Sequence, residues 1–180
     1  MRVALEGLIG AGKSTLLSLV EKQGVPTAQE AVDVWGTLLT RFYADPERWA
    51  FTLQMQILLT QGQMAATGVA ERSPHSALHV FAREKLDGEE WRLLEQWTER
   101  QGWTPGAVVF LKADPDLCLR RVRLRERPGE ESITLEYLEE LDRKYADYLT
   151  LCQSQGIPVH VLSHDDPELQ GVLRSLAASP

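Results

Sequence analysis

The most specific chemical pattern in the sequence lies close to the N-terminus, where residues 7–14 read GLIGAGKS and match G-x-x-x-x-G-K-[ST] in full. Glycines allow backbone N–H groups to wrap around a phosphate, and a following helix adds the positive end of its dipole. The Lys13 ammonium would reach terminal phosphates, and the Ser14 hydroxyl would bind Mg²⁺. The residues expected to hold a nucleoside triphosphate are Gly7, Leu8, Ile9, Gly10, Ala11, Gly12, Lys13, Ser14 and Thr15.

Two carboxylates follow weak strand patterns and are the next candidates. Glu30 comes after residues 25–28, and the pair Glu71-Arg72 comes after residues 67–70. A carboxylate that faces a phosphate loop repels phosphate, so Glu30 is of use there if it accepts a proton from an acceptor alcohol. Glu71 could hold Mg²⁺ through water, and Arg72 could neutralise a transferring group. The structural alternatives are a solvated Glu30 and a plain ion pair at the sheet edge.

Arginines gather between Arg120 and Arg127, which is unusual in an acidic chain. At helical spacing Arg121 and Arg125 share one face, and Pro128-Gly129 would end the helix. Most charge runs are solvated helix faces, and that interpretation competes here. Because the run follows a strand in a chain with a phosphate loop, we predict a lid at about residues 120–131. Its cations would neutralise the phosphates and exclude water.

The elements that must position these residues alternate between strands and helices. Apolar, partly β-branched segments predict strands at 3–5, 25–28, 67–70, 107–111 and 158–162. Helical periodicity predicts helices at 16–20, 32–43, 47–64, 76–85, 88–101, 117–125, 135–155 and 167–178. This alternation predicts an α/β fold, with a five-stranded parallel sheet and helices on both faces. Ligands should gather at the carboxyl ends of the strands, where the candidates above lie.

Composition limits the classes of protein that fit. With 180 residues, 43% of them hydrophobic, the chain can form one domain over residues 1–180 with a full core. A net charge of -7 argues against a nucleic-acid partner. No apolar run could cross a bilayer, and the first strand begins too early to leave room for a signal peptide, so we expect a cytoplasmic protein without a membrane partner. Cys118 and Cys152 lack metal-ligand spacing.

Among nucleotide-binding classes, the residues favour a small-molecule kinase. A GTPase would carry an Asn-Lys-x-Asp base reader, but the clearest strand ends in Lys112-Ala113-Asp114-Pro115. A mechanical ATPase would carry a strand that ends in a magnesium-binding Asp, and we find no convincing one. A kinase needs an acid–base group, cations for the equatorial oxygens and a lid, and the chain offers a candidate for each.

Taken together, these residues resemble the deoxyribonucleoside kinase family, over a stretch from the phosphate loop to about Tyr148. The most specific match is Glu71-Arg72-Ser73, the E-R-S signature of that family. Two further matches, at residues 43–54 and 133–138, follow in the right order. The resemblance implies a P-loop kinase fold with an arginine-rich lid, use of ATP and Mg²⁺, and a homodimer. It also implies transfer of the γ-phosphoryl group of ATP to the 5′-hydroxyl of a deoxynucleoside.

The resemblance also implies roles at individual positions. Glu30 matches the general base for the 5′-hydroxyl, Arg72 the arginine near the 5′-oxygen, and Glu71 a magnesium contact. Lys13 and the lid arginines Arg121, Arg125 and Arg127 would act on the phosphates. Tyr43 and Glu130 match the pair that binds the 3′-hydroxyl, Gln54 the amide that reads the base edge, and Leu53 and Phe81 the residues that sandwich the base. Trp35 borders the substrate, and residues 163–166 would lie near adenine.

Three positions depart from the family pattern and bear on the choice of base. Members that prefer deoxycytidine or purines carry an Asp and an Arg where this chain has Ala77 and Gln61. Ala77 leaves an apolar gap where the methyl group of thymine would lie, and Leu53 replaces the usual Phe. We therefore expect thymidine among the good substrates, deoxycytidine as a possible one and purines as poor ones.

Two alternatives stay open on the sequence. A nucleoside monophosphate kinase of the thymidylate kinase type shares the fold and lid, but it would carry an Asp-Arg where this chain has Glu71-Arg72. A non-catalytic ATP-binding regulator would bind ATP without transferring phosphate.

Overall fold

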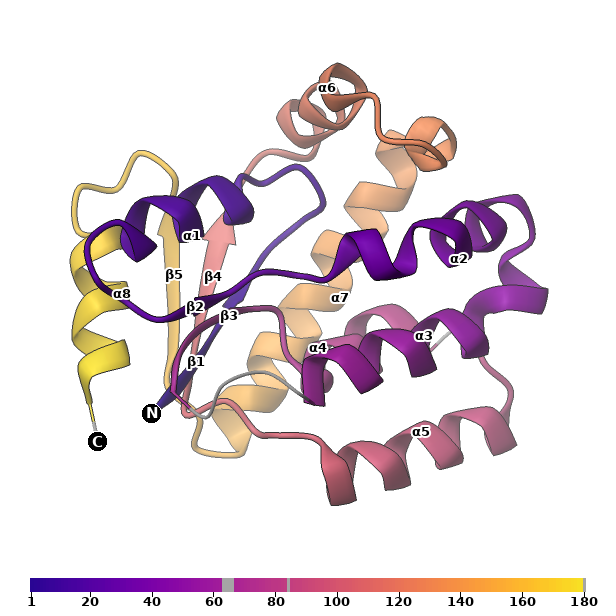
Figure 1. Ribbon diagram of the computed structural model, residues 1–180, viewed down its shortest axis with the longest axis horizontal. Coiled ribbons are helices and arrows are strands. Elements are labelled where there is room, and N and C mark those ends of the chain that lie inside the picture. Colours follow the sequence, from indigo (N-terminus) through magenta and orange to yellow (C-terminus); the bar gives the residue numbers. More distant parts are fainter. Residues whose placement is uncertain (63–66, 84, 180) are drawn as a thin grey trace.

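The computed structural model describes residues 1–62, 67–83 and 85–179, and within these ranges five parallel strands form one sheet in the order β2-β3-β1-β4-β5 (Figure 1). The strands are β1 (Arg2–Glu6), β2 (Thr27–Ala28), β3 (Gly68–Glu71), β4 (Ala107–Lys112) and β5 (Val159–Ser163). This sheet confirms the α/β architecture that the sequence predicts.

The helical segments surround this sheet. They are α1 (Lys13–Glu21), α2 (Val32–Ala44), α3 (Pro46–Gly62), α4 (Pro74–Ser76), the π-helix η1 (Ala77–Ala82), α5 (Gly88–Gln101), α6 (Pro115–Arg125), the 3₁₀-helix η2 (Glu130–Ser132), α7 (Leu135–Ser154) and α8 (Leu169–Ala178). Figure 1 shows α1 and α8 together beside the sheet, α7 behind it, and α2, α3 and α5 extending to one side. Within the described residues, no helix combines the length and the apolar character that crossing a bilayer requires.

The central strands are apolar because helices cover both of their faces. Val3, Ala4 and Leu5 of β1 are fully buried, as are most residues of β4. In the register of β1 with β3, Leu5 pairs with Glu71, and Glu6 is the last residue of its strand. The carboxyl ends of these strands therefore bring Glu6, the phosphate loop and Glu71 to one edge of the sheet.

Local boundaries differ from the sequence prediction in three places. The segment predicted as a helix at 76–85 is mainly the π-helix Ala77–Ala82, because a single wide turn leaves almost the same apolar pattern as an α-helix. The strand predicted at 25–28 is reduced to two residues. The lid helix ends at Arg125 as the range 117–125 predicted, but it is Glu126 with φ 46° that ends it and not Pro128-Gly129, so Arg127 lies outside the helix. The end predicted for the helix at 47–64 lies outside the described residues.

Candidate active site

The phosphate loop requires glycine for steric reasons. Gly10 and Gly12 have φ values of 85° and 99°, which L side chains rarely adopt. A Cβ on Gly10 would lie 2.5 Å from the carbonyl oxygen of Cys118, so the backbone of α6 leaves no room for a side chain. A Cβ on Gly12 would lie 3.2 Å from Cδ2 of His164, so the segment predicted near adenine lies against this loop. Its contact with adenine stays a prediction.

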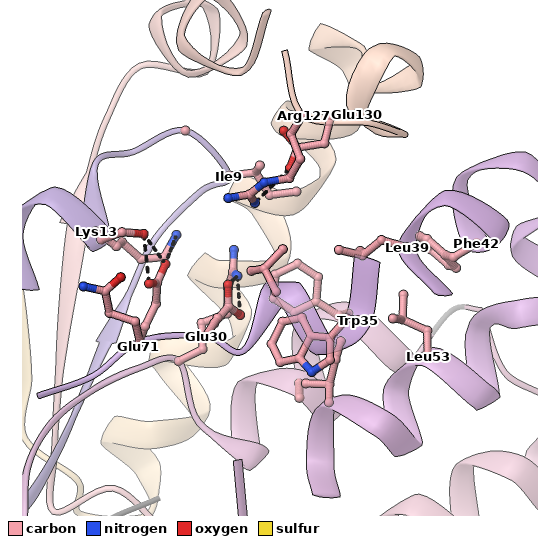
Figure 2. A pocket seen from close by; sticks show the side chains of 18 of the residues that line it. Ile9, Lys13, Glu30, Trp35, Leu39, Phe42, Leu53, Glu71, Arg127 and Glu130 are labelled. Carbon is pink, nitrogen blue, oxygen red and sulfur yellow. Dashed lines mark hydrogen bonds and ion pairs between the residues drawn. The ribbon is translucent and has the colours of Figure 1, made fainter. Parts of the chain in front are cut away.

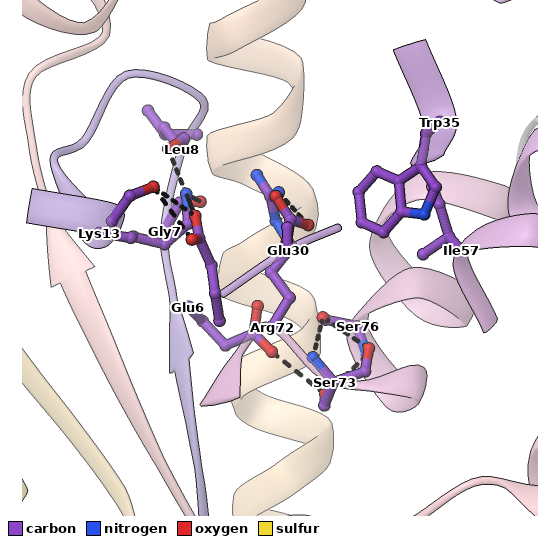
Figure 3. Close-up of polar contacts among 12 residues, drawn as sticks. Glu6, Gly7, Leu8, Lys13, Glu30, Trp35, Ile57, Arg72, Ser73 and Ser76 are labelled. Atoms are coloured by element: carbon purple, nitrogen blue, oxygen red, sulfur yellow. Dashed lines mark hydrogen bonds and ion pairs between the residues drawn. The ribbon is translucent and has the colours of Figure 1, made fainter. Parts of the chain in front are cut away.

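Lys13 folds its ammonium back into the loop. Its Nζ donates to the carbonyl oxygens of Leu8 at 2.9 Å and Gly7 at 3.1 Å (Figure 3). Burial lowers the pKa of Lys13 to about 8; the positive charge of Arg72 adds to this, and the nearby carboxylates partly oppose it. At this pKa the ammonium stays mostly charged near pH 7, and a bound phosphate would stabilise the charged form further.

Ser14 and Glu71 bring hard oxygen ligands together beside Lys13. The Ser14 hydroxyl donates to Oε2 of Glu71 at 3.0 Å, and Oε1 of Glu71 lies 3.8 Å from Nζ of Lys13. Mg²⁺ prefers such oxygen donors and is commonly bound by one or two protein groups together with the phosphates of the substrate. These two residues fit the predicted magnesium site. Within the described part of the chain, no group of three or more His, Cys, Asp or Glu residues is suited to a metal ion.

Glu30 and Arg72 meet at the centre of the site. Both carboxylate oxygens of Glu30 lie 2.6 Å from Nη1 of Arg72. The guanidinium also stacks on Phe81, with Cζ 4.7 Å from the ring centroid. Arg72 has a left-handed backbone with φ 61°, which costs a residue with a Cβ about 1–3 kcal/mol. The fold accepts this strain and directs the Arg72 side chain toward Glu30. Figure 2 shows Glu30 between the Lys13–Glu71 pair and Trp35.

A cavity of about 310 Å³ extends from the phosphate loop to α2 and α3. A space of this size is at the lower end of the range for small-molecule sites. The sequence-predicted residues that line it are Ile9, Gly10, Lys13, Ser14, Glu30, Trp35, Tyr43, Leu53, Gln54, Glu71, Arg72, Ala77, Phe81, Arg125, Arg127 and Glu130. The predicted residues outside its lining are Gly7, Leu8, Ala11, Gly12, Thr15 and Arg121. Arg121 nevertheless contacts the phosphate loop, because its Nη1 donates to the carbonyl oxygen of Ala11 at 3.2 Å.

The far end of the cavity combines apolar walls with amides. Trp35 is 3% exposed, and its indole N–H donates to Thr60 at 3.0 Å, which fixes the ring. Leu53 lies nearby and is also buried (Figure 2). Oε1 of Gln54 and both amide atoms of Gln61 are buried and have no hydrogen-bond partner among the residues that the structure describes. Gln54 and Gln61 lie two helical turns apart, so they share one face of α3.

Glu130 holds two lid arginines. Arg125 binds it with two hydrogen bonds of 2.6 and 2.7 Å, and Nη1 of Arg127 lies 3.3 Å from its Oε1. Burial raises the pKa of Tyr43, and the neighbouring Tyr137 and Glu130 raise it further, so the Tyr43 hydroxyl keeps its proton. The predicted 3′-hydroxyl pair and the predicted phosphate-binding arginines thus meet at one carboxylate.

Sequence reasoning missed residues whose partners lie far away in the chain. Tyr137 lines the cavity, and burial raises its pKa to about 12. Glu6 is fully buried and accepts hydrogen bonds from Ser73 and Tyr145, both at 3.1 Å. A charged residue at the end of an apolar strand was the available signal for Glu6. Helical spacing between Tyr137 and Tyr145 would have placed both on one face of α7.

Comparison with known proteins gives a consistent result. The family model for deoxynucleoside kinases matches residues 3–174. A "Putative deoxynucleoside kinase" of frog virus 3 is 33% identical over 163 residues, which cover 82% of this chain and 83% of the viral protein. The "Probable deoxycytidine kinase" of fowlpox virus is 29% identical over 89% of this chain and 77% of its own length. Human deoxycytidine kinase is 28% identical over 82% of this chain and 75% of its own length.

Proposed function

Because the chain belongs to the deoxynucleoside kinase family and transfers phosphate from ATP to a nucleoside, we propose that its acceptor is the 5′-hydroxyl of a pyrimidine deoxynucleoside. Thymidine is the expected substrate, and deoxycytidine is the second candidate. Membership of this family favours a nucleoside kinase over the two alternative functions that the sequence left open, a nucleoside monophosphate kinase and a non-catalytic ATP-binding regulator.

The observation that carries the choice of a nucleoside base is the set of unpartnered amide atoms at the far end of the cavity. A buried amide without a partner destabilises a protein, so the fold is expected to keep one there for a ligand. The edge of a pyrimidine presents a donor and an acceptor side by side, which the Gln54 amide can match with one donor and one acceptor. Trp35 and Leu53 offer apolar surface for the faces of a base.

The preference for thymidine rests on a small apolar residue that lines the same cavity as these amides. Ala77 is 2% exposed and lines the cavity, so a methyl group on the base would meet a small apolar residue there. Gln61 lines the same cavity as a neutral amide rather than a cation, and it can donate to a carbonyl or accept from an amino group. This dual capacity supports thymidine together with deoxycytidine.

In the proposed mechanism, Glu30 accepts the proton of the 5′-hydroxyl. The oxygen then forms a bond to the γ-phosphorus of ATP while the bond between that phosphorus and the bridging oxygen breaks, and ADP leaves. Arg72 lies 2.6 Å from Glu30 and would turn part of its guanidinium to the charge on the transferring group. Lys13 and the lid arginines Arg121, Arg125 and Arg127 would act on the phosphates.

Ser14 and Glu71 would hold Mg²⁺, which would supply positive charge to neutralise the phosphates of ATP. Tyr43 and Glu130 would bind the 3′-hydroxyl of the sugar, and Phe81 would cover one face of the base.

Two further expectations concern the oligomeric state and the location of the protein in the cell. The homodimer that the sequence resemblance implies would pair apolar faces around residues 76–85 and 135–148, and light scattering of the purified protein tests it. Cytoplasmic location stays a prediction that cell fractionation would test.

A substrate panel with ATP and Mg²⁺ tests the proposed acceptor. Thymidine, deoxycytidine, deoxyadenosine, deoxyguanosine and thymidine monophosphate are compared by kcat/KM, with chromatography of the products. We expect the two pyrimidine deoxynucleosides to exceed the two purine deoxynucleosides by at least about tenfold, which a difference of about 1.4 kcal/mol in binding the transition state would produce. Faster phosphorylation of deoxyguanosine or deoxyadenosine, or of the monophosphate, contradicts the proposal.

A further inference from the structure

Arg72 is held from two sides inside the protein. Its Nη1 faces Glu30, whereas its Nε donates to the hydroxyl oxygen of Tyr145 at 3.2 Å. Because that oxygen accepts from Arg72, the Tyr145 proton is free to point elsewhere, and it donates to Oε2 of Glu6 at 3.1 Å. A hydrogen-bonded chain thus connects Glu6 through Tyr145 to Arg72 and then to Glu30. Figure 3 shows Glu6, Arg72 and Glu30 along this line.

Glu6 is a fully buried carboxylate that the reaction itself does not require. Its second oxygen, Oε1, accepts from the Ser73 hydroxyl at 3.1 Å, so both of its oxygens have partners. Burial raises the pKa of Glu6, and the charge of Arg72 together with its donors Ser76, Ser73 and Tyr145 partly offsets this. Both oxygens of Glu6 accept hydrogen bonds, which a glutamine amide could not reproduce with its NH2 group, so the carboxyl group at this position needs a reason.

That reason lies in the charge change at Glu30. When Glu30 accepts the proton of the substrate, it becomes neutral, and Arg72 loses the negative partner that faced it. Glu6 accepts the Tyr145 proton and so keeps the Tyr145 oxygen turned toward Nε of Arg72, which leaves the buried guanidinium with a hydrogen-bond partner throughout the step. The strained φ of 61° at Arg72 and its stacking on Phe81 fix the same side chain from the backbone and from one face.

The geometry points to Glu6 and Tyr145 as positioning residues that hold the Arg72 guanidinium in its catalytic orientation while Glu30 changes charge. This inference rests on the proposed roles of Glu30 and Arg72. Neither Glu6 nor Tyr145 lines the cavity, so both act through Arg72 and not through contact with the substrate.

The chain offers a matched pair of variants for the test. Tyr145 and Tyr148 lie one turn apart on α7, and both are buried. The Tyr148 hydroxyl lies 3.3 Å from Ser73, whereas the tyrosine that Arg72 contacts is Tyr145, so Tyr148→Phe removes a buried hydroxyl without breaking the chain. Tyr145→Phe makes the same chemical change and breaks the chain at its middle.

Steady-state kinetics with thymidine and ATP should separate the two variants. We expect Tyr145→Phe to lower kcat by about 10- to 100-fold, because a hydrogen bond to a charged group is lost, and to leave both KM values within about threefold. Tyr148→Phe should stay within about threefold of the wild type in kcat. Equal kcat values for the two variants would overturn the inference. If Glu30→Gln stops turnover while Tyr145→Phe does not slow it, the inference fails and the proposed function stands.

A double mutant tests whether Glu6 and Tyr145 act through one chain. Glu6→Gln should lower kcat with the same small effect on KM, and Glu6→Gln combined with Tyr145→Phe should match the slower single variant within about twofold. Multiplied effects in the double variant would mean independent roles and would overturn the chain. Should Glu6→Gln not fold, as thermal unfolding would reveal, the comparison of Tyr145→Phe with Tyr148→Phe decides the matter alone.

Discussion

The two ends of the cavity differ in whether their buried polar groups have hydrogen-bond or ion-pair partners. At the end of the cavity beside the phosphate loop, here called the phosphate end, charged side chains are paired with one another, as Glu30 is with Arg72 and Glu71 is with Lys13. At the base end, Gln54 and Gln61 together carry three buried amide atoms that lack a partner within residues 1–62, 67–83 and 85–179. At the phosphate end the charged groups have partners without a ligand, whereas at the base end, within the described residues, three amide atoms do not.

This difference predicts opposite consequences for stability. Removing one member of a buried ion pair leaves a charge without a partner, which destabilises the fold. Removing an unpartnered amide relieves an existing cost, so it should stabilise the fold while it weakens recognition. In the proposed function the phosphate end would carry out catalysis, whereas the base end would keep a cost that a bound base offsets. Substitutions at the two ends test this contrast directly.

The largest expected effect is at the phosphate end. Glu30→Gln removes the base for the 5′-hydroxyl, and we expect kcat to fall by about 10²- to 10⁴-fold. The glutamine is nearly isosteric, so ATP binding, measured by calorimetry, should be retained. The variant should also be less stable to urea, because Arg72 loses its charged partner. A near-normal kcat would exclude Glu30 as the base.

The base end should respond with the opposite sign in stability. Gln54→Leu removes a buried amide whose Oε1 has no partner in the part of the chain that the structure describes, and we expect the free energy of unfolding to rise by about 1–2 kcal/mol. The value of kcat/KM for thymidine should fall by about 100-fold, because the base edge loses both of its hydrogen bonds. Urea unfolding and steady-state kinetics on one preparation measure both quantities. A destabilised variant would contradict the contrast between the two ends.

The sequence predicted that the residues of the phosphate end lie close together, and the structure brings them together because the determinants are local. The phosphate loop is a contiguous motif, and Glu30 and Glu71-Arg72 follow directly after strands whose carboxyl ends meet in any parallel sheet. Once the alternation of strands and helices is recognised, these positions are fixed relative to one another without knowledge of side-chain packing. The structure accordingly places Glu30 against Arg72 at 2.6 Å.

Partners that depend on tertiary packing could not be predicted in this way. Tyr145 lies 139 residues from Glu6 in the chain, and nothing local indicates that they are hydrogen-bonded. Arg125 was predicted to act on phosphate, but which carboxylate holds it without a ligand depends on how the loop after α6 folds back. The π-helix Ala77–Ala82 has the apolar pattern of an α-helix, so its wider turn could not be predicted from the sequence.

Glu130 lies between the two ends, and a smaller effect there would sharpen the contrast. Glu130→Gln weakens both the proposed 3′-hydroxyl contact and the pairing of Arg125, and we expect KM for thymidine to rise by about tenfold. The matched control is 2′,3′-dideoxythymidine, which lacks the 3′-hydroxyl. Its KM should be the same for the variant and the wild type. Equal losses with both substrates would show that Glu130 does not contact the sugar.

Unpartnered atoms outside the cavity provide the smallest and most discriminating test. Nδ1 of His79 is buried without a partner in the described residues, yet His79 packs on Trp91 and Tyr148 away from the cavity. Burial lowers the pKa of His79 to about 4, with smaller contributions from His75 and Arg83. An unfolded histidine binds its proton near pH 6.5, so between pH 6.5 and pH 4 the unfolded state holds more protons than the folded state.

The free energy of unfolding should therefore fall as the pH drops through this window, and His79→Phe should remove that part of the fall. After allowance for partial exposure of the ring, we expect the variant to lose about 1 kcal/mol less than the wild type between pH 7 and pH 5. Urea unfolding at the two pH values measures this. Because His79 does not line the cavity, His79→Phe should leave kcat/KM for thymidine unchanged at pH 7, in contrast to Gln54→Leu. If His79→Phe lost activity as Gln54→Leu does, missing partners would not distinguish a ligand site from a tolerated neutral side chain.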